Sequence, residues 1–98
     1  MSRLGGGSVL RRRADVRYRI LDEEGVVVRQ NAGEVLVLNY LGTRILGLAD
    51  GAAPVAAWID ALMHELDVDR PRLERDVLAF AGELVEQELL ELAAGGEP

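Results

Sequence analysis

The sequence predicts a small α+β domain of the winged helix-turn-helix type, in which a three-stranded antiparallel sheet precedes three helices (β-β-β-α-α-α). Three short stretches with strand character, separated by turn residues, occupy residues 16–38. A helical pattern follows the last of them without a loop, and two more helical patterns, separated by a short turn, complete the chain. With 98 residues, 49% of them hydrophobic, the chain can enclose one modest core.

The predicted domain occupies residues 14–92, between a flexible lead-in (1–13) and a flexible tail (93–98). Three consecutive glycines, Gly5 to Gly7, cannot be held cheaply in a regular element. The cluster Arg11–Arg13 could contact a phosphate or an acidic partner, but three arginines make a small patch. We interpret the cluster as a solvated run of charge.

The three strands are predicted from alternation and from the turns between them. Val16–Leu21 alternates apolar and polar side chains, as a half-buried strand does. A turn at 22–25 follows, where Gly25 can adopt a positive φ, and it leads into a second strand, Val26–Gln30. A turn at 31–33 then leads into the aliphatic third strand, Glu34–Leu38.

The first helix is predicted directly after the third strand. Asn39 suits the N-cap because its side chain can accept a hydrogen bond from an otherwise unpaired helix N–H. Apolar residues then recur at helical spacing over Tyr40–Asp50, and Gly51 is expected to end the helix in a left-handed conformation.

Two further helices form the helix-turn-helix. Pro54 precedes the second, Val55–Leu66, and Asp69 is a suitable N-cap for the third, Arg70–Glu88, which has Pro71 in its first turn. The third helix has an apolar stripe at spacings of four, three and four residues, which is typical of a core-facing helix. A short extended piece is expected at residues 89–92.

Composition excludes several classes of function. The absence of cysteine removes disulfides, thiolate metal sites and cysteine nucleophiles, and no apolar run is long enough to span a bilayer. His64 is the sole histidine, and no nucleophile stands at a spacing that would pair with it. Asp67 and Asp69 resemble the start of a calcium loop whose remainder is missing. We therefore expect no catalysis, no metal, no cofactor and no membrane contact, and a cytoplasmic location.

Nucleic-acid binding is the alternative that a helix-turn-helix raises. The net charge of −6 disfavours it, because such proteins normally present a basic face. The third helix offers Arg70, Arg72 and Arg75 near its start, but its later surface is acidic. A winged-helix DNA-binding transcriptional regulator therefore remains the alternative, and binding of nucleic acid is not expected.

Peptide binding has a positive argument in the third strand. Glu34–Leu38 contains neither proline nor an inward charge, so as an edge strand it could accept an extended peptide. The third helix carries a second apolar flank of Leu78, Ala81 and Val85, which with Gly82 could line a groove beside that edge. The first helix or a homodimer partner could equally bury this flank, and a structural homodimer that pairs these edges is a third alternative.

Two segments resemble the PqqD-like family. Val35–Gly51 (VLVLNYLGTRILGLADG) is similar to the family's strand-to-helix signature, in which an aliphatic strand, Leu-Asn and a closing Asp-Gly recur. Leu66–Leu90 (LDVDRPRLERDVLAFAGELVEQELL) is similar to its closing helix. The resemblance covers about 16–92 and rests mainly on core residues. One departure is Glu88, which stands where many relatives have glycine, so the turn after the third helix is expected to differ.

The resemblance implies a non-catalytic recognition element for the biosynthesis of ribosomally made, post-translationally modified peptides (RiPPs). Such a domain binds the leader of a precursor peptide as an added strand and presents the rest to a modifying enzyme, such as a radical SAM enzyme, a leader peptidase or a cyclase. Carried over by position, the peptide-binding residues would be Glu34, Val35, Leu36, Val37 and Leu38 on the third strand, with Arg75, Leu78, Gly82 and Val85 on the third helix.

Overall fold

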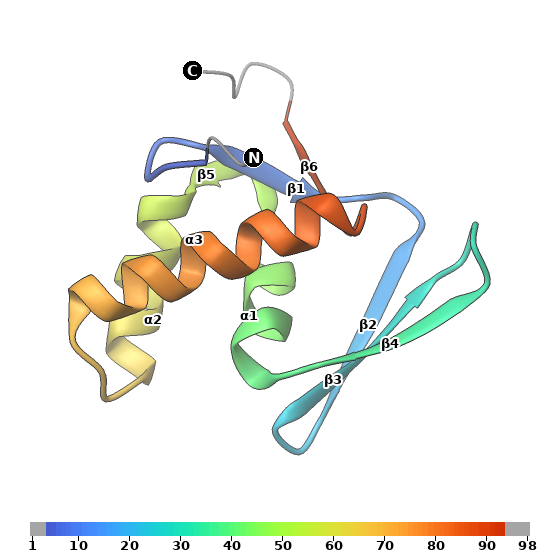
Figure 1. Cartoon of the computed structure of the whole chain (residues 1–98), viewed down its shortest axis with the longest axis horizontal. Coiled ribbons are helices and arrows are strands. Elements are labelled where there is room, and N and C mark those ends of the chain that lie inside the picture. Colours follow the sequence, from blue (N-terminus) through green and yellow to red (C-terminus); the bar gives the residue numbers. More distant parts are fainter. Residues whose placement is uncertain (1–3, 94–98) are drawn as a thin grey trace.

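The computed structural model describes residues 4–93, which form an α+β domain. The elements in chain order are β1 (Val9–Arg12), β2 (Val16–Leu21), β3 (Glu24–Arg29), β4 (Glu34–Leu38), α1 (Tyr40–Leu48), β5 (Asp50–Pro54), α2 (Val55–Glu65), α3 (Arg70–Glu86) and β6 (Leu90–Leu92). The predicted three strands followed by three helices are confirmed as β2–β4 and α1–α3. Figure 1 shows the three helices gathered on one side of the β2–β3–β4 meander.

The meander is antiparallel with strand order β2-β3-β4. Its register pairs Tyr18 with Val27 and Val27 with Leu36, and these three side chains lie on the face that carries buried Val16. The positive φ in the β2–β3 turn belongs to Asp22, at 57°, and not to Gly25, the residue of this turn that was expected to be able to adopt it.

Gly25 is needed for a different reason, the close approach of α1 to the sheet. A Cβ on Gly25 would lie within 2.7 Å of the Cβ of Thr43, whose side chain is fully buried. Asn39 caps α1 as predicted, since its Oδ1 accepts a hydrogen bond from the N–H of Gly42 at 2.8 Å. The junction from strand to helix is therefore held by a side-chain cap and by a glycine beneath the helix.

A second sheet of three short strands, in the order β5-β1-β6, was not predicted. Its central strand β1, Val9–Arg12, lies in the expected flexible lead-in, so that prediction is wrong for these four residues. Leu10 is fully buried between two strands that follow it by 40 residues or more along the chain. The sequence did not reveal this strand because four residues with one buried side chain show little periodicity. The strands that supply its hydrogen bonds are also distant along the chain.

The arginines around β1 form pairs within the chain. Arg11 Nε lies 2.7 Å from a carboxylate oxygen of Glu91, and Arg13 Nη1 lies 3.4 Å from the other oxygen. Arg12 places its guanidinium 5.1 Å from the centre of the Tyr18 ring, within range of a cation–π contact. The cluster is thus partly neutralised, which differs from the solvated run that was expected.

The predicted extended piece at 89–92 is confirmed as β6. Ala93, expected in the flexible tail, is buried, and its N–H donates to the carbonyl of Val9 at 2.9 Å. The remaining residues of the tail, 94–98, and the first three of the lead-in lie outside the described residues.

Two helix ends differ from the predictions. The helix α1 ends at Leu48 with Ala49 as its C-cap, and Gly51, at φ 81°, lies inside β5. The helix α3 ends at Glu86, and Glu88 then adopts φ 64°. The N–H of Glu88 donates to Val85 and that of Leu89 to Leu84, which is the Schellman pattern that usually has glycine at the left-handed position. The turn is therefore of the glycine type even though its residue is glutamate.

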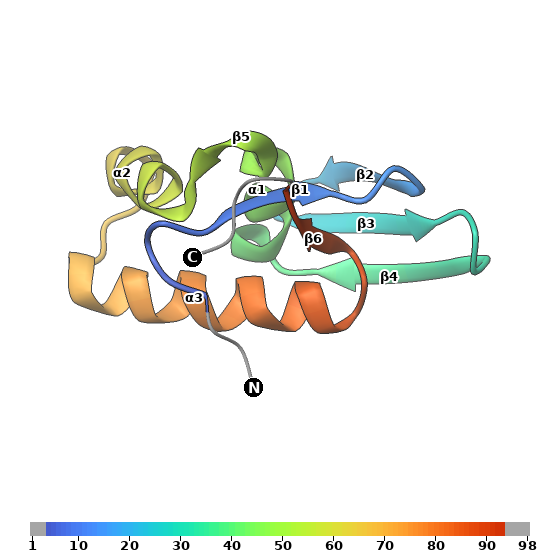
Figure 2. The ribbon, with the colours of Figure 1, turned by 90° about the horizontal axis from the view of Figure 1, so that it is seen from above.

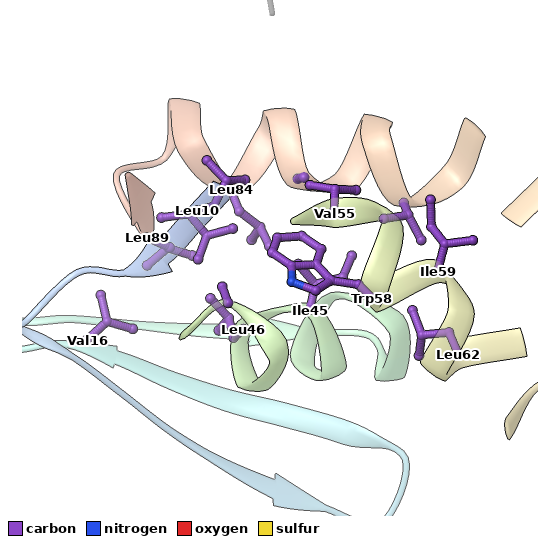
Figure 3. Packing of buried hydrophobic residues seen from close by; sticks show 14 of the residues in the cluster. Leu10, Val16, Ile45, Leu46, Val55, Trp58, Ile59, Leu62, Leu84 and Leu89 are labelled. Atoms are coloured by element: carbon purple, nitrogen blue, oxygen red, sulfur yellow. The ribbon is translucent and has the colours of Figure 1, made fainter. Parts of the chain in front are cut away.

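One hydrophobic core joins the helices to both sheets. Figure 3 shows Trp58 of α2 at its centre, close to Ile45 of α1, with α3 above. Trp58 is 1% exposed, and its Nε1–H has no acceptor within residues 4–93. Leu10 and Leu89 extend the core into the second sheet. Burial of large side chains on this scale dominates the stability of a domain this size, because each stabilises by about 1.5–3 kcal/mol.

Candidate functional site

The strand β4 is an edge of the meander, as the sequence predicted for a peptide-binding strand. It pairs with β3 alone among the described strands. The side chains of Val35 and Val37 are 66% and 63% exposed, whereas Leu36 and Leu38 are half-buried on the core face. The strand therefore anchors itself with alternate leucines and presents the rest of its length to solvent.

The register identifies which peptide groups of β4 are free. Gln30, which continues β3, donates its N–H to the carbonyl of Asp15, so even-numbered residues of β3 bond toward β2. Odd-numbered residues of β3 therefore bond toward β4, where their partners are Glu34, Leu36 and Leu38. The N–H and C=O groups of Val35 and Val37 consequently point to the open edge.

Another edge strand of the molecule is less available to a peptide. In β5, Oδ1 of Asp50 accepts hydrogen bonds from the N–H groups of Ala53 and Ala52, at 3.0 and 2.9 Å. These two hydrogen bonds lower the pKa of Asp50 below its ordinary value, and the bond from Ala53 has the larger effect. Pro54 at the end of β5 also has no N–H to donate, and proline protects an edge. In β4 the one charged residue, Glu34, lies on the core face beside Leu36, so the expectation of no inward charge on this strand was wrong, but its carboxylate is paired with Arg29.

The strand β2 is the other edge of the meander, and its position distinguishes it from β4. By the same register, the N–H groups of Val16, Tyr18 and Ile20 point outward, and that of Val16 is already bonded to Arg13. Figure 2 shows that β4 is the strand of the meander nearest to α3, with β2 the most distant. A peptide on β4 would therefore have a helix beside it, whereas a peptide on β2 would not.

The predicted α3 residues lie on one helical face. Arg75, Leu78, Gly82 and Val85 follow one another at spacings of three, four and three residues. Gly82 is buried, Leu78 and Val85 are half-buried, and Arg75 is exposed. The leucine and valine pack against the edge of the core, so the face is a partly covered apolar stripe. Ala81, the other member of the expected flank, is fully buried in the core.

Arg29 connects β4 to the end of α3, and sequence reasoning missed it. Its Nη1 lies 2.7 Å from Glu34 at the start of β4, and its Nη2 lies 3.2 Å from Glu88 just after α3. The Arg29 side chain is 21% exposed, and its Nε is buried without an acceptor in the described chain. An arginine on the core face of a strand is the signal that could have indicated this link, since such a residue needs carboxylate partners.

A second ion pair holds α1 against α2. Nε of Arg44 donates to Glu65 Oε1 at 3.0 Å, a second guanidinium nitrogen bonds the other oxygen, and the Tyr40 hydroxyl donates at 3.4 Å. The hydrogen bonds from Arg44 lower the pKa of Glu65 below its ordinary 4.5, and the same contact raises the pKa of Arg44. The pair links α1 to the last residue of α2.

The surface of α3 does not suit nucleic acid. Arg70, at its start, is paired with Asp60 at 2.7 Å and with Glu74 at 3.2 Å, and Arg72 lies 3.8 Å from Asp76. These carboxylates compete with phosphate for the arginines that a recognition helix would use.

No group of three or more histidine, cysteine or acidic side chains within residues 4–93 is arranged to hold a metal ion. His64 lies exposed in the last turn of α2. Of the described helices, none has the length and apolar character required to cross a bilayer.

Comparison with known proteins places this geometry in a family. The model for coenzyme PQQ synthesis protein D (PqqD) matches residues 20–90. A PqqA binding protein of Rhodopseudomonas palustris strain CGA009 is 34% identical over 82 residues, which cover 84% of this chain and 78% of the relative. A second, from strain TIE-1, matches equally.

Solved structures show the same fold. TbiB1 in complex with the TbiA(beta) leader peptide is similar with a TM-score of 0.71 and 32% identity, covering 83% of this chain and 94% of that one. A lasso peptide synthetase B1 complexed with the leader peptide is similar with a TM-score of 0.70 and 24% identity, covering 84% of this chain and 96% of that one. At this identity the likeness shows the fold alone. From the family model and the relatives of Rhodopseudomonas palustris, this chain belongs to the PqqD family.

Proposed function

We propose that this protein is a non-catalytic adaptor that binds the leader segment of a ribosomally made precursor peptide and presents it to a modifying enzyme. The observation that carries the proposal is the open edge of β4, where the peptide groups of Val35 and Val37 point to solvent beside α3. A relative named for binding PqqA and a similar structure solved with a leader peptide support it.

The mechanism is strand addition. A leader that lies along β4 forms main-chain hydrogen bonds with Val35 and Val37, which supply affinity with little dependence on sequence. Leader side chains on the core face would meet Leu36, Leu38 and the α3 stripe that contains Leu78, which supply selectivity. Holding the precursor beside its enzyme raises the effective concentration of the segment to be modified.

The proposed peptide site contains Glu34 through Leu38 together with the α3 face of Arg75, Leu78, Gly82 and Val85. Glu34 is held by Arg29, which also holds Glu88 after α3. We assign Arg29 a positioning role, because it joins the two elements that would flank the peptide at the end where β4 begins.

The direct test is a titration of isotope-labelled protein with a synthetic leader peptide, taken from a small open reading frame that neighbours the gene. The amide signals of Val35 and Val37 should shift most and become protected from solvent exchange. A scrambled leader of the same composition is the control. If the true leader leaves both amides unmoved, strand addition at β4 is wrong.

Separate measurements on the leader-free protein distinguish the two alternatives. A DNA-binding regulator would bind duplex DNA with an affinity that falls steeply with added salt. A structural homodimer that pairs β4 edges would show protected Val35 and Val37 amides before any leader is added, with a sedimentation coefficient that depends on concentration. Neither behaviour is expected of an adaptor whose β4 edge is free to accept a leader.

A further inference from the structure

The face of the meander that points away from the helices is largely apolar. Side chains alternate along each strand, and buried Val16 and Val27 mark the core face. The opposite face therefore carries Arg17, Arg19 and Leu21 on β2, Glu24, Val26 and Val28 on β3, and Val35 and Val37 on β4. Figure 1 shows the meander nearly edge-on, with every described helix on one side of it and no described element on the other.

This outer face is a continuous patch. Val26 is paired with Val37 and Val28 with Val35, so four valines adjoin across two strands. Val35 and Val37 are more than 60% exposed, and Leu21 is 52% exposed. An antiparallel sheet with one buried face normally has polar residues on the other, and exposed contiguous apolar area marks an interaction surface.

Two arginines border the patch on the β2 side. Neither Arg17 nor Arg19 forms an ion pair within residues 4–93, and Arg17 bonds instead to the backbone carbonyls of Ala14 and Val16, at 2.8 and 3.3 Å. Both arginines line an open depression together with apolar side chains of β2 and β3. In a chain of net charge −6, this is a local basic border that faces outward.

A second copy of the chain does not suit this face. A face-to-face pair whose two-fold axis runs beneath the central strand β3, either parallel or perpendicular to the strands, puts the β2 arginines over β4 or over β2 of the other copy. The outward residues of those strands are arginines and Leu21 on β2, and Val35 and Val37 on β4, so neither strand supplies a carboxylate. The arginines would be buried against like charge or against valine, which is unfavourable.

We infer that the outer face docks a second protein whose contact surface is apolar and carries carboxylates opposite Arg17 and Arg19, and that this protein is the enzyme that acts on the peptide held at β4. The inference rests on the proposed function. A leader added to β4 would continue the sheet, so its own outward side chains would extend the valine patch. A protein that covers the patch would therefore contact the bound leader as well, and would favour the loaded adaptor over the empty one.

The experiment uses the full chain, the labelled leader peptide and a recombinant enzyme that modifies the same precursor. The first measurement is leader affinity by fluorescence anisotropy, and the second is enzyme affinity for the leader-loaded chain. Val26→Thr/Val28→Thr keeps shape and strand propensity but makes the patch polar. Arg19→Glu reverses charge at the border, and Arg72→Glu makes the same change on α3, where its side chain is 67% exposed. Circular dichroism establishes that each variant folds.

Both patch variants should retain leader affinity within about twofold, because these side chains do not touch the open edge. Each should weaken enzyme binding by about tenfold or more, as expected for the centre and the charged border of an interface, and Arg72→Glu should leave it unchanged. Enzyme binding that survives both patch variants overturns the inference. A wild-type dimer that Val26→Thr/Val28→Thr dissociates also overturns it, since the face would then be a self-interface. Failure of the leader to bind wild-type protein is seen in the first measurement and overturns the proposed function together with this inference.

Discussion

Replacing Val37 by proline should weaken leader binding without unfolding the protein. The N–H of Val37 points to the open edge, so proline removes no hydrogen bond from the β3–β4 ladder. The Val37 side chain is 63% exposed, and little packing is lost with it. We expect the free energy of unfolding to change by less than about 1 kcal/mol, as is usual for exposed edge positions.

The expected loss of affinity follows from the two outward-facing peptide groups of β4. A leader on β4 can bond only through Val35 and Val37, and proline at 37 deletes one donor and leaves a leader carbonyl without its partner. The lost bond and the unpaired group together cost about 1–3 kcal/mol, which raises the dissociation constant by about 5- to 150-fold. Val37→Thr keeps the N–H and should bind within about threefold of wild type.

Two matched prolines make the test decisive. Ile20→Pro deletes an outward N–H on the opposite edge of the same sheet and should leave leader affinity unchanged. Leu36→Pro deletes an N–H that bonds to β3 and should destabilise the fold by about 2 kcal/mol or more, through the lost bond and the unpaired β3 carbonyl. Affinity is measured by anisotropy and stability by urea denaturation. Strand addition at β4 is refuted by a Val37→Pro protein that binds normally, or by an Ile20→Pro protein that does not.

Three further changes test the fold around the site. Glu88→Gly should raise the free energy of unfolding by about 0.5–1 kcal/mol. Glycine relieves the strain of a left-handed glutamate at φ 64°, and this gain exceeds the loss of one exposed ion pair. The control Glu88→Gln keeps the backbone strain and should not stabilise the protein. Gly25→Ala should lower the free energy of unfolding by about 3 kcal/mol or more in urea denaturation, because the new Cβ would lie within 2.7 Å of all three side-chain atoms of buried Thr43. Gly7→Ala, with open space around the new Cβ, should be neutral. Hydrogen bonding from Arg44 lowers the pKa of Glu65 below 4.5, so this pair should stabilise the fold at neutral pH and lose that contribution as the pH falls below 4.5 toward the lowered pKa. Wild type should exceed Glu65→Gln by about 0.5 kcal/mol at pH 7, and the difference should shrink with acid; a difference independent of pH would contradict the assignment.

Local patterns in the sequence determined the meander and the three helices. Alternation in Val16–Leu21 and the aliphatic run Glu34–Leu38 are period-two signals that short turns join, and Asn39 is a cap whose partner lies three residues away. These interactions lie within a few residues along the chain, so their signals survive in sequence. The family followed from the same segments, because its motifs are the core residues of this fold.

Only the tertiary structure decided the features that depend on distant partners. The strand β1 exists because β5 and β6, far along the chain, supply its hydrogen bonds and bury Leu10. Arg29 meets Glu88 across 59 residues, and no local pattern marks that contact. The register alone shows that Val35 and Val37, rather than Leu36, present their peptide groups to the open edge. The sequence could therefore indicate the edge strand proposed to bind the leader. Which of its hydrogen-bonding groups are free follows from pairing with β3, which is a property of two strands together.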